Sequence, residues 1–324
     1  MRLRRLSLRG FGLVLTAWGV AAAAHAQQTS EDAWVADPEA LRDPPFGADD
    51  QVGATNRLTP EVVLRAVGLV QEGEVVSLAI PLNRDTPAYG WRRFEVIVSQ
   101  NEGTDKSNNE DYVSAPINTG TNLDGLAHMG IQGHFHGGRS GEDIQTPHGL
   151  RELGIEHARP IVARAHLLDM PALMGVDRLE IGYEITVTDI EAAMRRQGIA
   201  AIEPGDAVLF HTGHRLLLES GTQADRELFL SGQPGPGAAA AHWLAERGVV
   251  AVGGDSGSME VVPAPEGRLF PVHQILLALN GIHIIENLAT ERLAHGGWDT
   301  FLFVAAPLPL TGSSSSWVNP LAIR

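Results

Sequence analysis

The chain has 324 residues, of which 44% are hydrophobic, so it can bury one large core or two modest ones. Its formal net charge of −15 argues against a nucleic-acid partner, because an acidic surface repels phosphate. The absence of cysteine excludes disulfides and a thiol nucleophile, and it leaves histidine and carboxylate side chains to hold any metal.

Residues 1–26 have the pattern of a secretory signal. Arginines precede an apolar run over 13–24, and a small-x-small cleavage motif follows at 24–26. The run is too short and too rich in alanine to span a bilayer comfortably, although an uncleaved anchor is the alternative. Arg4 and Arg5 leave twin-arginine export open beside the general secretory route. We therefore expect a periplasmic or secreted mature protein that is not attached to a membrane.

The rest of the chain alternates predicted helices with short apolar strands. Residues 27–45 are polar and rich in proline, which indicates an extended N-terminal arm. Thr59 is a predicted N-cap, because proline and an acid follow it, and this helix is expected to end at Gly73. A capping-box pattern at Thr188 opens another helix, which is expected to end at Gly198.

The second half of the chain carries the most regular alternation. Helices are expected between Gly237 and Gly248 and over 271–279. Strands are predicted from the apolar runs at 75–80, 94–98, 160–169, 207–211, 249–253, 282–286 and 301–305. Neither a linker nor an internal repeat interrupts residues 46–324, so the alternation predicts a single α/β domain there.

The stretch from Asn118 to His128 is the first candidate site. It contains Asn122, Asp124 and two glycines, and glycine lets a backbone approach a ligand closely. Asp124 and His128 are four residues apart, and imidazole serves near neutral pH as an acid, a base or a metal ligand. A hydrogen-bonded aspartate beside a structural histidine is the alternative for this spacing taken alone.

Further candidates lie toward the C-terminus. His273 begins a predicted helix, and Glu286 ends an apolar strand, where a carboxylate must be paired or bound. Asp255 and Glu260 follow a buried strand and His211 ends another, at positions where loops carry function in open α/β sheets. A surface histidine, a salt-bridged glutamate and an Asx-turn are the structural alternatives. No nucleophile elbow, Walker loop, dinucleotide fingerprint or His-Glu-x-x-His motif occurs in the sequence.

Taken together, these segments resemble the cyclase family of metal-dependent hydrolases, which includes bacterial kynurenine formamidase. The signature of that family is His-x-Gly-Thr-His-x-Asp-x-Pro-x-His. Its glycine, threonine, aspartate and last histidine are matched here by Gly120, Thr121, Asp124 and His128. Asn118 and Asn122 stand in place of its first two histidines, and Leu126 replaces its proline. The resemblance runs from about residue 46 to the end, with further matches at 46–60, 204–213, 254–260, His273 and 285–288.

The resemblance implies a compact α/β domain of the swivelling β/β/α type, with a mixed sheet core and flanking helices. It also implies a homo-oligomer and one or two divalent ions, commonly zinc or manganese. The metal-ligand positions of the family fall on Asp124, His273, Glu286, Asn118 and Asn122. His128 falls on its proton-transfer position. An amide oxygen is a weaker ligand than imidazole and suits Mn²⁺ better than Zn²⁺. Residues 46–60 look like a longer branch of the family, whose members often carry glutamine at one or both asparagine positions.

We therefore expect an exported, metal-dependent hydrolase of small amides, lactams or lactones, such as aryl formamides. It would act on C–N bonds other than peptide bonds, with His128 moving the proton. His211, Asp255 and Glu260 are expected to contact the substrate. The alternative is an exported small-molecule binding protein, on a scaffold of this family that has lost its metal and its catalysis.

Overall fold

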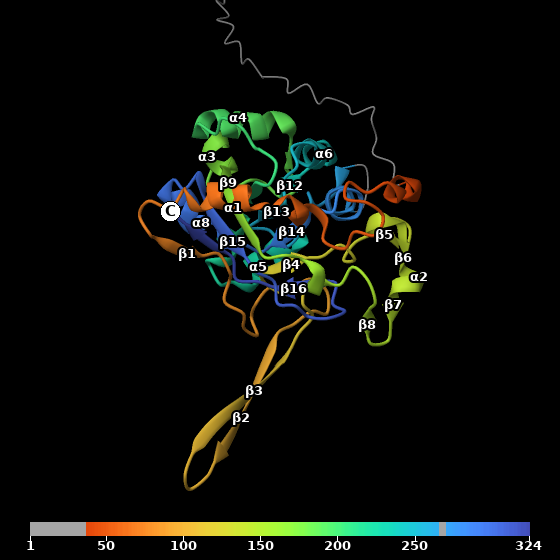
Figure 1. Ribbon diagram of the computed structural model, residues 1–324. Coiled ribbons are helices and arrows are strands. Elements are labelled where there is room, and N and C mark those ends of the chain that lie inside the picture. Colours follow the sequence, from red (N-terminus) through yellow and green to blue (C-terminus); the bar gives the residue numbers. More distant parts are fainter. Residues whose placement is uncertain (1–36, 266–269) are drawn as a thin grey trace, which may run out of the picture. The chain divides into compact units, whose positions relative to one another are not determined.

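The computed structural model describes residues 37–265 and 270–324, and Figure 1 shows their arrangement. All described residues belong to one compact unit. The predicted signal and the first part of the predicted arm lie outside the described residues. The described part of the arm contains a short 3₁₀ helix, η1 (Pro38–Arg42), whose Leu41 is buried beside Ile131 and Ala278. Within residues 37–265 and 270–324, no helix is both long and apolar enough to cross a bilayer.

A mixed sheet of nine strands forms the centre of this unit, in the order β1-β17-β15-β9-β11-β13-β14-β4-β16. The neighbours among β9, β11, β13 and β14 are parallel, and every other neighbouring pair is antiparallel. In sheet order the strands are β1 (Val75–Ser77), β17 (Leu321–Ile323), β15 (Thr300–Ala305), β9 (Ile161–Asp169), β11 (Ala207–His211), β13 (Ala251–Gly254), β14 (His283–Glu286), β4 (Asn122–Asp124) and β16 (Ser315–Trp317).

The central strands are buried on both faces, which is why they read as unbroken apolar runs in the sequence. Alternate residues of a strand point to opposite faces. On β11, Val208 and Phe210 pack in one core cluster, whereas Ala207 and Leu209 pack in the other. The predicted α/β fold with a mixed sheet and flanking helices is therefore confirmed.

Helices cover the sheet and connect its strands. Their bounds are α1 (Pro60–Val67), α2 (Gly141–Ile144), α3 (Met170–Met174), α4 (Val187–Gln197), α5 (Gln223–Ser231), α6 (Ala238–Glu246), α7 (Pro271–His273), the π-helix η7 (Gln274–Leu279) and α8 (Glu291–Gly296). Shorter 3₁₀ turns are η2 (Gly53–Arg57), η3 (His136–Gly138), η4 (Ile155–His157) and η5 (His214–Leu218). The first core cluster packs against α4, α6 and η7 through Ile190, Leu244 and Leu276.

Two helix boundaries differ from the prediction. Helix α1 ends at Val67, not at Gly73, because Gly68 already acts as its C-cap. The N-cap of helix α4 is Thr186, two residues before the predicted Thr188, which lies inside the helix. Thr186 and Asp189 exchange the two capping-box hydrogen bonds. The predicted helix over 271–279 is present, but most of it is the π-helix η7.

Four small ribbons complete the secondary structure. They are β2 (Glu95–Glu102) with β3 (Ser107–Ser114), β5 (His134–Phe135) with β6 (Arg139–Ser140), β7 (Gln145–Thr146) with β8 (Gly149–Leu150), and the parallel pair β10 (Glu184–Ile185) with β12 (Gly235–Pro236). The β2–β3 ribbon is almost entirely exposed and projects from the sheet in Figure 1. Only part of β2 was expected from the sequence, because β3 is polar and carries no apolar run.

Candidate metal centre

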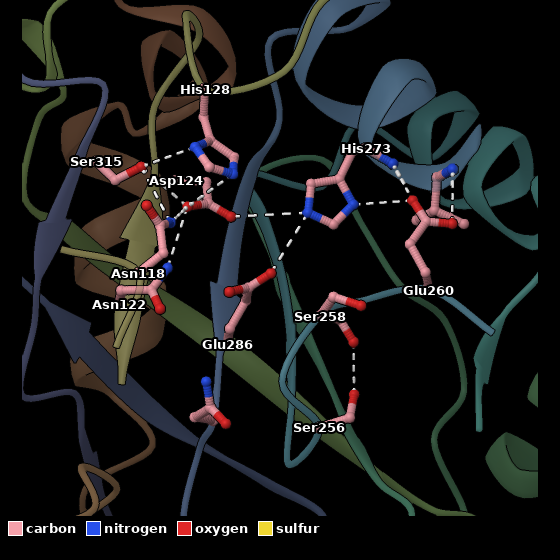
Figure 2. A network of polar contacts seen from close by, with 12 residues as sticks. Asn118, Asn122, Asp124, His128, Ser256, Ser258, Glu260, His273, Glu286 and Ser315 are labelled. Carbon is pink, nitrogen blue, oxygen red and sulfur yellow. Dashed lines mark hydrogen bonds and ion pairs between the residues drawn. The ribbon is translucent and has the colours of Figure 1, made fainter. Parts of the chain in front are cut away.

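The edge of the sheet brings the candidate residues together. Strand β4 lies between β14 and β16, so Asn122 is paired with Glu286 on one side. On the other side Asp124 is paired with Ser315. His273 reaches the same place from helix α7, as Figure 2 shows. The site therefore joins three strands and a helix that are far apart in the sequence.

Asp124 is fully buried, and its two carboxylate oxygens have different surroundings. Oδ1 accepts hydrogen bonds from Asn118 Nδ2 at 2.7 Å, Asn122 Nδ2 at 3.1 Å and Ser315 Oγ at 3.0 Å. Oδ2 has no hydrogen-bond partner among the described residues and lies 3.8 Å from His273 Nε2. One oxygen is thus held in place by neutral donors, while the other stays free for a ligand.

Asn118 and Asn122 both turn their amide nitrogens toward Asp124. A carboxylate can only accept hydrogen bonds, so this orientation is required by chemistry. The Asn122 Oδ1 atom is buried and finds no partner within the described ranges. It joins Asp124 Oδ2 as a second buried acceptor without a donor, which is the state expected of a cation ligand. Whether the two asparagines bind metal stays a prediction.

His273 is buried and lies among carboxylates on both sides of its ring. Its Nε2 is 3.4 Å from Glu286 Oε1, and its Nδ1 is 2.8 Å from Glu260 Oε1. Burial lowers the pKa of His273, but hydrogen bonds and charge from Glu260 and Glu286 outweigh it and raise the pKa to about 10. Burial and then the charge of Asp124 raise the pKa of Glu286.

The donor set fits a divalent cation. Asp124, Glu260 and Glu286 are three buried carboxylates grouped around one shared imidazole, His273. Such an excess of buried negative charge is costly unless a cation compensates it. The ligand atoms of Asp124, His128 and His273 also lie within 4.8 Å of one another. The two acceptors without donors lie in this same group.

His128 lies at the border between this cluster and a cavity. Ser315 donates to Asp124, so its oxygen accepts the Nδ1–H of His128, at 3.2 Å. The other ring nitrogen, Nε2, is then the basic one in the neutral ring, and it lies 3.8 Å from Asp124 Oδ1. His128 is half-buried and lines a cavity of about 350 Å³ together with Phe135 and Leu150. A proton-transfer group at a cavity wall can reach a small substrate.

Two of the predicted substrate contacts belong to another part of the molecule. Asp255 uses both carboxylate oxygens to accept hydrogen bonds from Thr212 and Gly213. His211 Nδ1 lies 2.8 Å from Thr290 Oγ1, and His211 lines a separate cavity of about 870 Å³. Their predicted role in substrate binding stays a prediction. Glu260, the third predicted contact, lies behind the ring of His273.

Ser315 was not among the residues predicted for the site. It lies on strand β16, where it is buried against Asp124. The available signal was a run of serines placed between apolar segments close to the C-terminus.

Comparisons with known proteins identify the family of this chain. The sequence profile described as "Putative cyclase" matches residues 76–261, which is more than half of the chain. The chain therefore belongs to this cyclase family, as the resemblance in the sequence implied. Kynurenine formamidase of Bacillus cereus is similar to it, with 24% identity over 251 residues that cover 77% of this chain and 97% of that protein.

Solved structures show the same fold. The crystal structure of a novel cyclase is 29% identical, with a TM-score of 0.79, and the match covers 86% of this chain and 98% of that one. Isatin hydrolase A from Ralstonia solanacearum is 23% identical, with a TM-score of 0.60, and the match covers 82% of this chain and 99% of that one. The nine-stranded sheet with its flanking helices is thus the cyclase fold.

Proposed function

We propose that this protein is a metal-dependent hydrolase of small amides or lactams, with lactones as further possible substrates. The observation that carries the proposal is the buried group of Asp124, His273 and Glu286, in which the Asp124 Oδ2 atom has no donor within residues 37–265 and 270–324. Relatives named as a kynurenine formamidase and as an isatin hydrolase support amide hydrolysis, since isatin is a cyclic amide.

The residues that would hold the ion are Asp124, His273 and Glu286, with Asn122 Oδ1 as a further oxygen donor. This set is rich in oxygen, which favours Mn²⁺ over Zn²⁺. The proposal covers either one or two bound ions. When bound, a divalent ion supplies Lewis-acid polarisation of a carbonyl and makes a water easier to deprotonate.

His128 is the residue we assign to proton transfer. Ser315 holds the Nδ1–H of His128, and this leaves the basic Nε2 to take a proton from the attacking water and return it to the leaving nitrogen. Substrate would lie in the neighbouring cavity, against Phe135 and Leu150 as apolar walls and Gln145 and Thr146 as polar ones. An aromatic amide suits such a lining.

We also propose export to the periplasm or the medium and assembly as a homo-oligomer. The N-terminal pattern supports the first. The second is supported by the β2–β3 ribbon, on which Ile97 and Tyr112 are 55% and 64% exposed, since such apolar exposure is typical of a contact surface. We further propose that the chain is a member of the longer branch of the family, which carries amide side chains in place of the motif histidines.

The test combines metal content with turnover. The purified mature protein is expected to contain a stoichiometric divalent ion and to hydrolyse at least one of a panel of aryl formamides, lactams and lactones. His128→Ala should reduce kcat by roughly 10²–10⁴-fold, the usual contribution of a general acid–base group, while the metal content stays unchanged. Equal kcat in the variant would exclude His128 from the reaction.

A binding protein without catalysis is the second candidate function. Asn118 and Asn122 favour it, because they offer amide nitrogens to Asp124 where the family has two imidazoles. In that case the protein would retain no metal after purification in metal-replete buffer, and it would bind the panel compounds without hydrolysing them.

A further inference from the structure

Glu260 makes an unusual set of contacts for a residue that was expected to meet the substrate. Its side chain is buried, and Oε1 accepts hydrogen bonds from the His273 backbone N–H at 2.7 Å and from His273 Nδ1 at 2.8 Å. Oε2 accepts from the Val272 backbone N–H at 3.2 Å. Figure 2 shows Glu260 on the side of the His273 ring that faces away from Asp124.

These contacts determine which nitrogen of His273 is available. A carboxylate only accepts hydrogen bonds, so Nδ1 must carry a proton. The opposite nitrogen, Nε2, is then the one directed at Glu286, at 3.4 Å, and at Asp124, at 3.8 Å. Which ring nitrogen meets a metal is set by the hydrogen bond that the other one makes.

The position of Glu260 is itself fixed by buried groups. Gln233 is fully buried and donates through Nε2 to the Glu260 carbonyl at 2.9 Å and to Ser258 Oγ at 2.8 Å. The side-chain oxygen of Gln233, Oε1, in turn accepts from the Tyr89 hydroxyl at 2.8 Å. Gln233 also forms a β-bridge with Val262. The turn that carries Glu260 is therefore held on both sides of the carboxylate.

Without a cation, the charge of Glu260 would pair with a protonated His273, but two further carboxylates, Asp124 and Glu286, lie at the same ring. A neutral side chain with an oxygen could satisfy most of these donors, whereas a third buried carboxylate close to Asp124 and Glu286 adds repulsion. The charge is useful when it increases the electron density of an imidazole that binds a cation, as carboxylate–histidine pairs do around metals.

We propose that Glu260 is a positioning residue of the metal centre, which fixes the ring of His273 through Nδ1 so that Nε2 faces the cation. The proposal rests on the proposed function, because it requires a divalent ion at Asp124, His273 and Glu286. It also replaces the expected substrate contact of Glu260 with a contact to a ligand of the metal.

The experiment measures metal binding directly. Metal-free wild-type protein and Glu260→Gln are titrated with Mn²⁺ by calorimetry, and the Co²⁺-loaded proteins are compared by visible absorption. Glu260→Gln should raise the Kd for Mn²⁺ by about 10–100-fold, the usual effect of losing an outer partner of a metal ligand, and alter the Co²⁺ bands. Glu260→Asp keeps the charge but is shorter by one methylene, so its Kd for Mn²⁺ should lie between the values of the wild-type protein and Glu260→Gln.

Asp206→Asn is the matched control. Asp206 is also a fully buried carboxylate that accepts a backbone N–H, from Glu203 at 2.8 Å, but its other contacts are arginines and His166. This variant should leave the Mn²⁺ Kd and the Co²⁺ spectrum unchanged, which separates a loss of stability from a loss of positioning.

The outcomes distinguish the two proposals. Tight wild-type binding with an equal Kd and spectrum in Glu260→Gln overturns the role of Glu260 alone. If Glu260→Gln does not fold, an unchanged Kd and spectrum in Glu260→Asp have the same consequence. If the wild-type protein binds neither Mn²⁺ nor Co²⁺, the proposed function fails, and the inference about Glu260 fails with it.

Discussion

Two buried aspartates of this protein, Asp206 and Asp124, have opposite surroundings. Asp206 is paired with Arg164 through two contacts, at 2.6 and 3.0 Å, and with Arg65 at 3.2 Å. Asp124 accepts hydrogen bonds from neutral donors at Oδ1, His273 lies 3.8 Å from its Oδ2, and a further carboxylate, Glu286, lies close by. Both side chains are inaccessible to solvent.

The difference lies in how each charge is compensated. At Asp206 the protein supplies the positive charge from its own arginines, so the group is complete as it stands. At Asp124 the protein supplies orientation but too little positive charge, and the remaining compensation must come from outside the chain. A buried carboxylate whose oxygen has no donor is therefore better evidence for a functional site than burial alone.

The largest expected effect comes from Asp124→Asn. The amide keeps an oxygen for Asn118, Asn122 and Ser315 but cannot bind a cation as a carboxylate does, so metal content and turnover should fall to background. The metal-free variant should be more stable than the metal-free wild type, by about 0.5–2 kcal/mol, because repulsion with Glu286 is removed. Elemental analysis and urea unfolding measure the two effects. A less stable variant would show that His273 already balances the charge of Asp124 within the chain, as arginines do for Asp206.

Asp206→Asn should act in the opposite direction. It should lower the free energy of unfolding by about 3 kcal/mol at pH 7, as for a broken buried ion pair. Burial raises the pKa of Asp206, but His166, Arg164 and the Glu203 backbone outweigh it and lower the pKa below its usual value. A lowered folded-state pKa stabilises the fold above the unfolded pKa of about 4, and this stabilisation disappears as the pH falls through the folded-state value.

The wild-type protein and Asp206→Asn should therefore differ most near neutral pH and converge in acid. Urea unfolding at several pH values between neutral and acidic conditions measures this convergence, with an unchanged m-value as the control for the unfolded state. A constant difference across that range would mean that the charge of Asp206 is not the source of its stabilising effect.

The sequence predicted the parts of the fold that depend on local apolar patterns. Strands β9, β11 and β14 were found nearly to the residue, because both of their faces are buried and they read as apolar runs. Strands β4 and β16 were missed, because each has three residues and takes its stability from pairing with a distant segment. No local pattern encodes such a pairing.

The residues of the candidate site also fall into those that the sequence predicted and those that only the structure revealed. Asp124, His273 and Glu286 could be chosen together because the chemistry of carboxylate and imidazole, and then the family resemblance, pointed to them. The contact of Ser315 with Asp124 spans 191 residues, so it needed the structure. Glu260 was a candidate in the sequence, but its contact with the His273 ring joins residues thirteen positions apart, and no local pattern predicts which side of the ring it takes.

The smallest expected effect tests this distant contact. Ser315→Ala removes the acceptor of the His128 Nδ1–H and one of the three donors to Asp124 Oδ1. Because two asparagine donors remain, metal affinity should change little, whereas kcat should fall by roughly 10-fold, the lower end for the loss of such an outer contact. Steady-state kinetics should show an unchanged KM.

Ser316→Ala is the matched control for this variant. Ser316 is the next residue on β16 and is equally buried, but its hydroxyl bonds the Trp317 carbonyl and the Leu308 N–H, away from His128. It should keep the wild-type kcat. If both variants lost activity equally, the strand as a whole would be responsible, and the orientation of His128 would not depend on Ser315. A loss confined to Ser315→Ala would show that Asp124 and His128 act as one unit joined by a hydroxyl.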